Sequence, residues 1–153
     1  MNADSRLSGV LHLLLHLMDS PDAIPSEKLA TALNSNPVVV RRTMAGLRDA
    51  RLVSSEKGHG GGWRLSCDPA KTTVLDVYRA LGSPRLFAMG HRCETPICLI
   101  EQAVNVALDD AFREAEALIT AQLSTLSLLA LSTDFSERIK VYTRTSKENP
   151  HAL

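Results

Sequence analysis

The chain has 153 residues, and 44% of them are hydrophobic, which is enough for a folded core and excludes global disorder. Its 17 basic and 17 acidic residues leave no net charge, which excludes a protein wrapped in nucleic acid but leaves room for a local basic patch. The three cysteines are too few for a disulfide scaffold, and no secretory signal or apolar run of about 20 residues occurs. We therefore expect a cytoplasmic protein that makes no contact with a membrane.

The first third of the sequence predicts three helices. Apolar residues recur at helical spacing in residues 5–18, and a short segment at 26–33 opens on Ser26, which we expect to cap it. Residues 37–52 follow a short turn and open with Pro37, which the first turn of a helix tolerates. Two short helices joined by a turn, the second bearing surface arginines, are typical of a helix-turn-helix.

The next segment predicts a β-hairpin. Strand-like residues 52–56 and 63–67 flank the glycine-rich stretch "KGHGGG", and a glycine-containing loop between two strands is typical of a hairpin. A phosphate-binding loop would need a helix after its glycines, and no Gly-Lys-Ser/Thr is present, so nucleotide binding is not favoured. A helix-turn-helix followed by a hairpin predicts a winged helix, in which we expect Trp63 to pack within the wing.

The second half predicts a different kind of structure. A helix at 72–82 stops at Gly82, a loop spans 83–97, and a long amphipathic helix runs from Cys98 to about residue 123. A helix of this length with an apolar stripe often pairs with its twin, although it could also pack on its own domain. A short apolar segment closes this region, and residues 133–153 are polar without strong periodicity.

The predicted fold class is therefore mostly α with a small β-hairpin. We expect a winged helix-turn-helix DNA-binding domain at 1–82, a sensor or linker loop at 83–97, dimerisation helices at 98–132 and a flexible tail at 133–153.

Taken together, these pieces resemble the Rrf2 (BadM-type) family of bacterial winged-helix transcription regulators. The most recognisable mark is the run from Gly60 to Leu65, "GGGWRL", and the resemblance covers residues 7–131. It implies a homodimer with two DNA-reading heads and a long carboxy-terminal helix that crosses to the partner.

Several members of the family hold an iron–sulfur cluster through three cysteines in the loop and at the start of the long helix. This sequence has Cys93 and Cys98, but residues 104–106 read Val-Asn-Val where the third cysteine is expected. Because such clusters usually need four ligands, the chain resembles the cluster-free branch, and we expect no cofactor.

Residues 37–64 carry six basic and two acidic residues, a net charge of +4. Among them, Arg41 and Arg42 lie in the first turns of the predicted recognition helix, where one is expected to read a base and the other to hold a phosphate. Asn36 could contact phosphate, although capping the helix is favoured. At the wing, side chains at the tip or beside it can reach phosphate or a minor groove. The candidate DNA contacts are Asn36, Val38, Arg41, Arg42, Thr43, Lys57, His59 and Arg64.

The loop cysteines are the candidate residues for sensing a signal. Cys98 starts the long helix, where the helix amino terminus stabilises a thiolate, and Cys93 is its candidate resolving partner in redox sensing. With His91 the pair could instead hold zinc, if Cys67 or the other subunit supplied a fourth ligand. The remaining interpretation is that both are ordinary loop and core residues.

These observations predict a dimeric transcription regulator, in the role of a repressor, that binds a palindromic double-stranded DNA operator and responds to thiol oxidation or a small ligand. Alternatives are an iron–sulfur or zinc-binding regulator of the same fold and a winged-helix module that binds protein. A thiol-dependent enzyme is not favoured, because the spacing is C-x-x-x-x-C and no Ser/His/Asp constellation is present.

Overall fold

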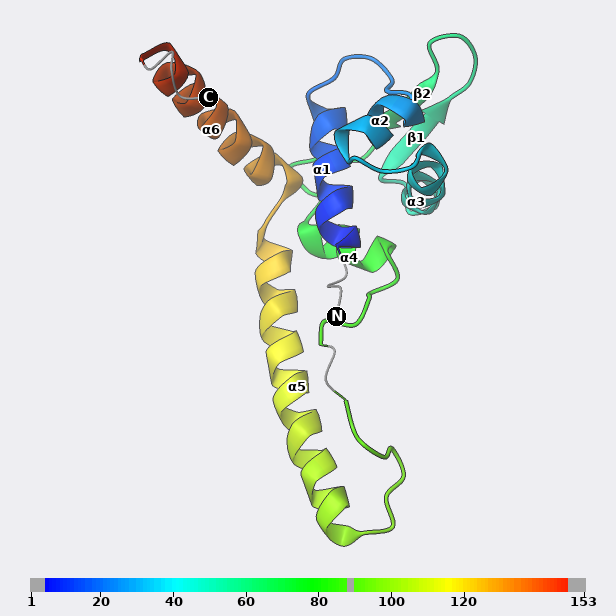
Figure 1. Cartoon of the computed structure of the whole chain (residues 1–153), viewed down its shortest axis with the longest axis vertical. Coiled ribbons are helices and arrows are strands. Elements are labelled where there is room, and N and C mark those ends of the chain that lie inside the picture. The colour runs from blue at the N-terminus through cyan, green and yellow to red at the C-terminus, as the bar shows by residue number, and fades with distance from the viewer. Residues whose placement is uncertain (1–4, 88–89, 149–153) are drawn as a thin grey trace.

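The computed structural model describes residues 5–87 and 90–148, with side chains described as far as residue 138. It is mostly helical with one antiparallel hairpin, which confirms the predicted fold class (Figure 1). The elements in chain order are α1 (Arg6–Met18), α2 (Ser26–Ala32), α3 (Pro37–Asp49), β1 (Val53–Glu56), β2 (Gly62–Leu65), α4 (Val74–Ala80), α5 (Leu99–Thr125) and α6 (Leu128–Glu148). The first six form a head, from which α5 and α6 extend in different directions (Figure 1).

The core of the head lies where α1, α2 and α3 meet the hairpin and the first turn of α6. The buried residues recur three or four positions apart in α1 and α3, so each helix turns one apolar stripe inward. The least exposed core side chains are Val10, Leu13, Leu14, Leu29, Val40, Met44, Leu47, Val53, Val77 and Leu128.

The wing is attached to the rest of the head through Trp63. The backbone groups of Trp63 and Ile24 form two hydrogen bonds of 2.9 Å, which add a short third strand segment beside β2. The Trp63 side chain is buried, as predicted, and its Nε1 donates to Oγ of Ser26 at 2.9 Å. Ser26 therefore does not cap α2, as the sequence had suggested, because its hydroxyl is used by Trp63 and Pro25 occupies the cap position.

The glycines of the wing serve two different purposes. Gly58 and Gly60 have φ values of 99° and 81°, which allow the chain to turn between the strands. Gly62 instead permits a close approach, because a Cβ atom there would lie 2.4 Å from the carbonyl carbon of Ile24.

The junction between α5 and α6 is fixed to the head by backbone hydrogen bonds. The amide of Val74 donates to the carbonyl of Leu126 at 2.8 Å, and the amide of Leu128 donates to the carbonyl of Thr72 at 2.9 Å. Leu128 is fully buried in the core, and a reciprocal capping box between Thr73 and Asp76 starts α4 at the same place. We call this set of contacts, residues 72–74 with 126–128, the clasp.

The carboxy-terminal part differs from the prediction. A loosely ordered tail was expected at residues 133–153, whereas α6 extends from Leu128 to Glu148, and residues 149–153 lie outside the described residues. The burial of Leu128 fixes the first turn of this helix, and an ion pair of 2.6 Å between Arg138 and Asp134 supports a later turn. Among the described residues, no helix combines the length and the apolar character that a membrane span requires.

Candidate nucleic-acid interface

Helix α3 turns one face to the core and the opposite face to solvent. Val40, Met44 and Leu47 point inward, while Val38 and Val39 are 66% and 56% exposed. Asn36 caps the helix, as predicted, by accepting a hydrogen bond of 2.8 Å from the amide of Val38. The amino-terminal turn of α3 is therefore fixed in place and open to a partner.

The two adjacent arginines of α3 lie in different environments. Arg41 forms an ion pair of 2.5 Å with Glu27 on α2, and both side chains are exposed. The pKa of the Glu27 carboxyl is lowered by hydrogen bonds from its own backbone amide and from Arg41. Arg42 is exposed and makes no ion pair or side-chain hydrogen bond within the described part of the chain. Arg42 is thus the arginine that is available to a ligand without breaking a contact.

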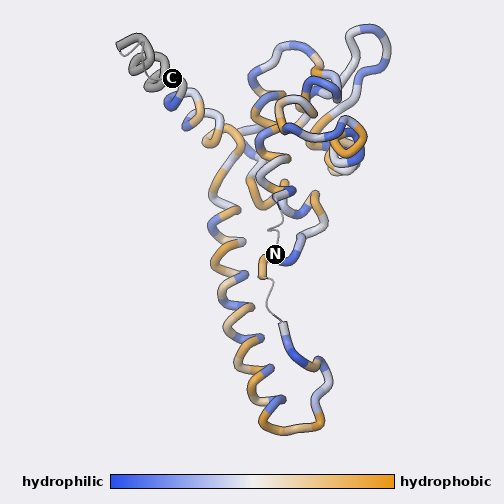
Figure 2. The backbone as a smooth tube through the Cα atoms, viewed as in Figure 1, coloured by the Kyte–Doolittle hydropathy of each residue, from blue (hydrophilic) through white to orange (hydrophobic). Residues whose placement is uncertain are grey.

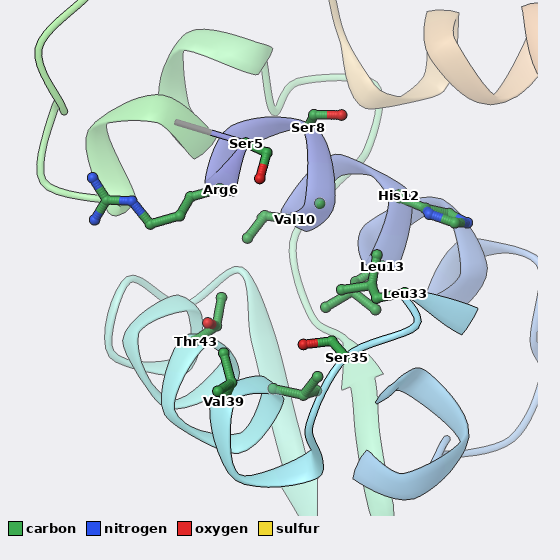
Figure 3. Close-up of a pocket in the computed structure, with 12 residues that line it drawn as sticks. Ser5, Arg6, Ser8, Val10, His12, Leu13, Leu33, Ser35, Val39 and Thr43 are labelled. Carbon is green, nitrogen blue, oxygen red and sulfur yellow. The ribbon is translucent and has the colours of Figure 1, made fainter. Parts of the chain in front are cut away.

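Thr43 lies on the flank of α3 that faces α1. It is partly buried and lines a cavity of about 340 Å³ between α1, the α2–α3 turn and α3, together with Val10, Leu33 and Val39 (Figure 3). The Thr43 side chain therefore lies at the edge of the outward face that Val38 and Arg42 occupy.

The wing places two of its three predicted residues at the tip. Lys57 and His59 are exposed between β1 and β2. Arg64 instead forms an ion pair of 2.8 Å with Glu56 and donates to the carbonyl oxygen of Pro21. In the free protein Arg64 therefore braces the wing against the segment that precedes α2.

The structure brings Val38, Arg41 and Arg42 together on α3, with the wing following α3 in the chain. Two residues of this surface were missed: Val39, which is exposed, and Glu27, which holds Arg41. Helical spacing from the buried Val40 could have placed Val39 outward, whereas the Glu27 pairing depends on the angle between α2 and α3 and leaves no local signal.

The loop before α5 runs back along that helix and is fastened to it. Nδ2 of Asn105 donates to the carbonyl of Cys93 at 2.8 Å, and Nε2 of Gln102 donates to the carbonyl of Pro96 at 3.0 Å. Nearer the head, the rings of Phe87 and Phe112 stack with their centroids 5.6 Å apart. Part of the predicted loop, residues 88 and 89, lies outside the described residues.

Cys93 and Cys98 are both exposed free thiols. Cys98 is the cap residue of α5, and the nearby backbone amides of Glu101 and Ile100 lower the pKa of its thiol. Nε2 of His91 is buried and lies 3.1 Å from Oδ1 of Asp109, but the two atoms are not aligned as a hydrogen bond. His91 therefore lies beside an acidic residue of α5.

Helix α5 has 27 residues, and none of them is buried. Its hydrophobic and hydrophilic positions alternate around the helix (Figure 2). One stripe, spaced three or four residues apart, contains Ile100, Val104, Leu108, Ala111, Ala115 and Leu118. Ile100 and Leu118, near its two ends, are 77% and 65% exposed. We call these six residues the α5 stripe.

A helix-turn-helix with an exposed, capped second helix and an adjoining hairpin defines a winged-helix protein of the DNA-binding class. Comparison with known proteins agrees. The model of the Rrf2 family, described as iron-dependent transcriptional regulators, matches residues 3–134. The chain belongs to the Rrf2 family.

Individual relatives support the same assignment. YwnA of Bacillus subtilis (strain 168), named as an HTH-type transcriptional regulator, is 35% identical over 126 residues, which cover 82% of this chain and 92% of that protein. A crystal structure described as a DNA-binding protein is 32% identical, covers 83% of this chain and 98% of its own, and has a TM-score of 0.65. A transcriptional regulator from Lactobacillus plantarum, 20% identical, shares the fold with a TM-score of 0.74 over 96% of this chain and all of its own. The chain is thus a transcription regulator with a DNA-binding fold.

The family description raises the question of iron, and the residues of this loop do not fit a cluster. The part of the chain that the structure describes contains no group of three or more His, Cys, Asp or Glu side chains that could hold a metal. Asn105 lies within the stretch where a third cysteine is expected, and its amide instead braces the carbonyl of Cys93. A direct hydrogen bond thus fastens the loop to α5 at this place.

Proposed function

We propose that two copies of this chain pair through the α5 stripe and act as a repressor on a palindromic operator. The observation that carries the dimer is a helix of 27 residues with no buried side chain and an apolar stripe along it. An apolar face of this extent is unusual on a monomer and is typical of helices that pair. In this proposal residues 1–82 form the DNA-binding head, 83–97 the sensor loop and 98–132 the dimerisation region.

Light scattering coupled to size-exclusion chromatography tests the dimer. Leu118→Glu places a charge in the α5 stripe and is expected to yield monomers, because pairing would bury that carboxylate in an apolar contact. Val106→Glu is the matched control, since Val106 is 60% exposed but lies off the stripe. A dimer that survived Leu118→Glu would rule out pairing through this stripe.

On DNA, each α3 enters a major groove. The observation that supports this is the exposed outward face of α3. Arg42 reads a base, because it alone of the adjacent pair makes no ion pair or side-chain hydrogen bond with the described residues. Arg41, Lys57 and His59 hold backbone phosphates, and Arg64 supports the wing.

Fluorescence anisotropy over a series of salt concentrations tests this assignment. Arg42→Ala should weaken operator binding by about 1 to 3 kcal/mol. Lys57→Ala should weaken binding to all sequences alike and lower the salt slope by about 1. Arg79→Ala removes the same charge from α4 and serves as the control. If Arg79→Ala and Arg42→Ala had equal effects, the interface would not involve the outward face of α3.

We further propose thiol oxidation as the input, because Cys98 combines exposure with a lowered thiol pKa. Its thiolate attacks hydrogen peroxide, so that the O–O bond breaks, a sulfenic acid forms, and the hydroxide that leaves takes up a proton from solvent to become water. The Cys93 thiol then displaces a second water to form a disulfide, which changes the path of the loop between head and α5.

Operator binding by the wild type, Cys93→Ser and Cys98→Ser proteins before and after hydrogen peroxide tests this step. We expect the peroxide to change the affinity of the wild type only. A peroxide response that remained in both variants would exclude the thiol mechanism and leave a small ligand as the input.

A further inference from the structure

The surface that contacts DNA in the proposed function contains an unusual pair of residues. Residues 38–40 are three consecutive valines, of which Val40 is 1% exposed while Val38 and Val39 remain 66% and 56% exposed. A solvent-facing helix position ordinarily carries a polar residue, and two neighbouring β-branched residues are not chosen for helix propensity. Helix formation therefore does not account for them.

The geometry of α3 places the two valines on either side of Arg42. At about 100° per residue, Val38 and Val39 lie on either side of the line opposite the buried Val40, Met44 and Leu47. Arg42 follows one turn later between them. The outward face of the recognition helix therefore presents Val38 beside the guanidinium, and Val39 lies at the edge of this face, where it also lines the cavity toward α1.

The two valines are also held in fixed positions. The amide of Val38 is bonded by the Asn36 side chain at 2.8 Å, and Pro37 fixes the backbone at the first helical residue. Within a helix, a valine side chain has one strongly preferred χ1 rotamer. Little conformational freedom is lost when such side chains meet a partner.

We propose, on the basis of the DNA-binding function above, that Val38 and Val39 read thymine through its C5-methyl group. The thymine methyl is the apolar group that the major groove displays, and an apolar side chain is its complement. Arg42 supplies the polar contact of the same interface by donating hydrogen bonds to O6 and N7 of a guanine. Side chains one helical turn apart span about one to two base-pair steps, so each operator half-site should hold thymines within about two base pairs of a guanine.

Uracil differs from thymine only in lacking this methyl, which makes the test specific. The full-length protein is first used to select duplexes from a random-sequence DNA pool, and the enriched duplex is then prepared with each thymine replaced in turn by uracil. Affinities are measured by fluorescence anisotropy for the wild type, Val38→Ala and Val39→Ala. Both variants should fold, because the sites are exposed and alanine favours the helix.

We expect uracil at one or two positions in each half-site to weaken wild-type binding by about fourfold per methyl, the ratio given by burial of one such group. In Val38→Ala, uracil at one of these positions should no longer weaken binding. In Val39→Ala, the same should hold for uracil at the other position. Val106→Ala, which removes an equally exposed valine from α5, should retain the wild-type pattern.

The failure of this inference and that of the proposed function look different. If a sequence is enriched but every uracil duplex binds as the thymine duplex does, the methyl reading is wrong while sequence-specific binding stands. If uracil weakens binding equally in the wild type and both valine variants, other residues read the methyl. If no sequence is enriched, the proposed function fails and the inference fails with it.

Discussion

Replacing Gly62 by alanine is expected to separate the wing from the segment before α2. The added Cβ would lie 2.4 Å from the carbonyl carbon of Ile24 and 2.7 Å from the nitrogen of Pro25, and both are backbone atoms that cannot rotate away. The segment before α2 and strand β2 must therefore move apart, which breaks the two 2.9 Å hydrogen bonds between Ile24 and Trp63. Each such bond contributes about 1 kcal/mol.

The same movement pulls the indole of Trp63 from Ser26, and a buried donor left without an acceptor costs a further 1 to 3 kcal/mol or so. The free energy of unfolding should therefore fall by about 3 to 5 kcal/mol in Gly62→Ala. Urea denaturation followed by tryptophan fluorescence, at one fixed protein concentration, measures this change, because Trp63 is the only tryptophan.

Gly46→Ala provides a matched control in the same head. Apart from its chain neighbours and the nearby backbone of α3 itself, no heavy atom of the described residues lies within 4 Å of a Cβ built at Gly46, which is an exposed position. This substitution should raise the free energy of unfolding by about 0.5 to 1 kcal/mol, since alanine favours the helix. If Gly62→Ala were as stable as the wild type, the close approach between the wing and Ile24 would be refuted.

Three further predictions concern the clasp and the loop. Leu128→Ala should lower the free energy of unfolding by about 2 to 5 kcal/mol through a buried cavity, as measured in urea; a loss under 1 kcal/mol would mean that α6 is not anchored in the core. Hydrogen bonds from Thr73 lower the pKa of the Asp76 carboxyl, so the stability they give is present above about pH 4 and is lost as the pH falls through the folded pKa. The urea stabilities of the wild type and Asp76→Asn should thus differ at pH 7 and converge on acidification, and a constant difference would contradict this. Because the pKa of Cys98 is lowered, iodoacetamide at pH 7 should modify it faster in the folded protein than in urea, and equal rates would count against the helix-terminus effect.

Much of the head could be predicted because its signals are local. The turn before Pro37, the glycines between two strand-like segments and the stop at Gly82 each depend on a few adjacent residues. The same is true of the cap at Asn36, whose side-chain oxygen accepts from the amide of Val38, two residues later.

Contacts between distant segments could not be predicted in the same way. Ser26 resembles a helix cap in sequence, but Trp63, 37 residues later, takes its hydroxyl. The polar residues after 133 suggested a flexible tail. Helix α6 instead starts at Leu128, whose burial against the head is a contact between distant segments that leaves no local signal in the sequence. On the candidate interface, the different surroundings of Arg41 and Arg42 follow from Glu27 on another helix.

The clasp also has a mechanical consequence. With its 27 residues, α5 is a rigid rod about 40 Å long that is attached to the head at one end, through the paired backbone of residues 72–74 and 126–128. A tilt of about 5° at that attachment moves the far end by about 3.5 Å, which is close to the rise of one base pair. In the proposed dimer, a displacement small enough to leave every helix intact would therefore shift the register between the two heads by a full step of the duplex.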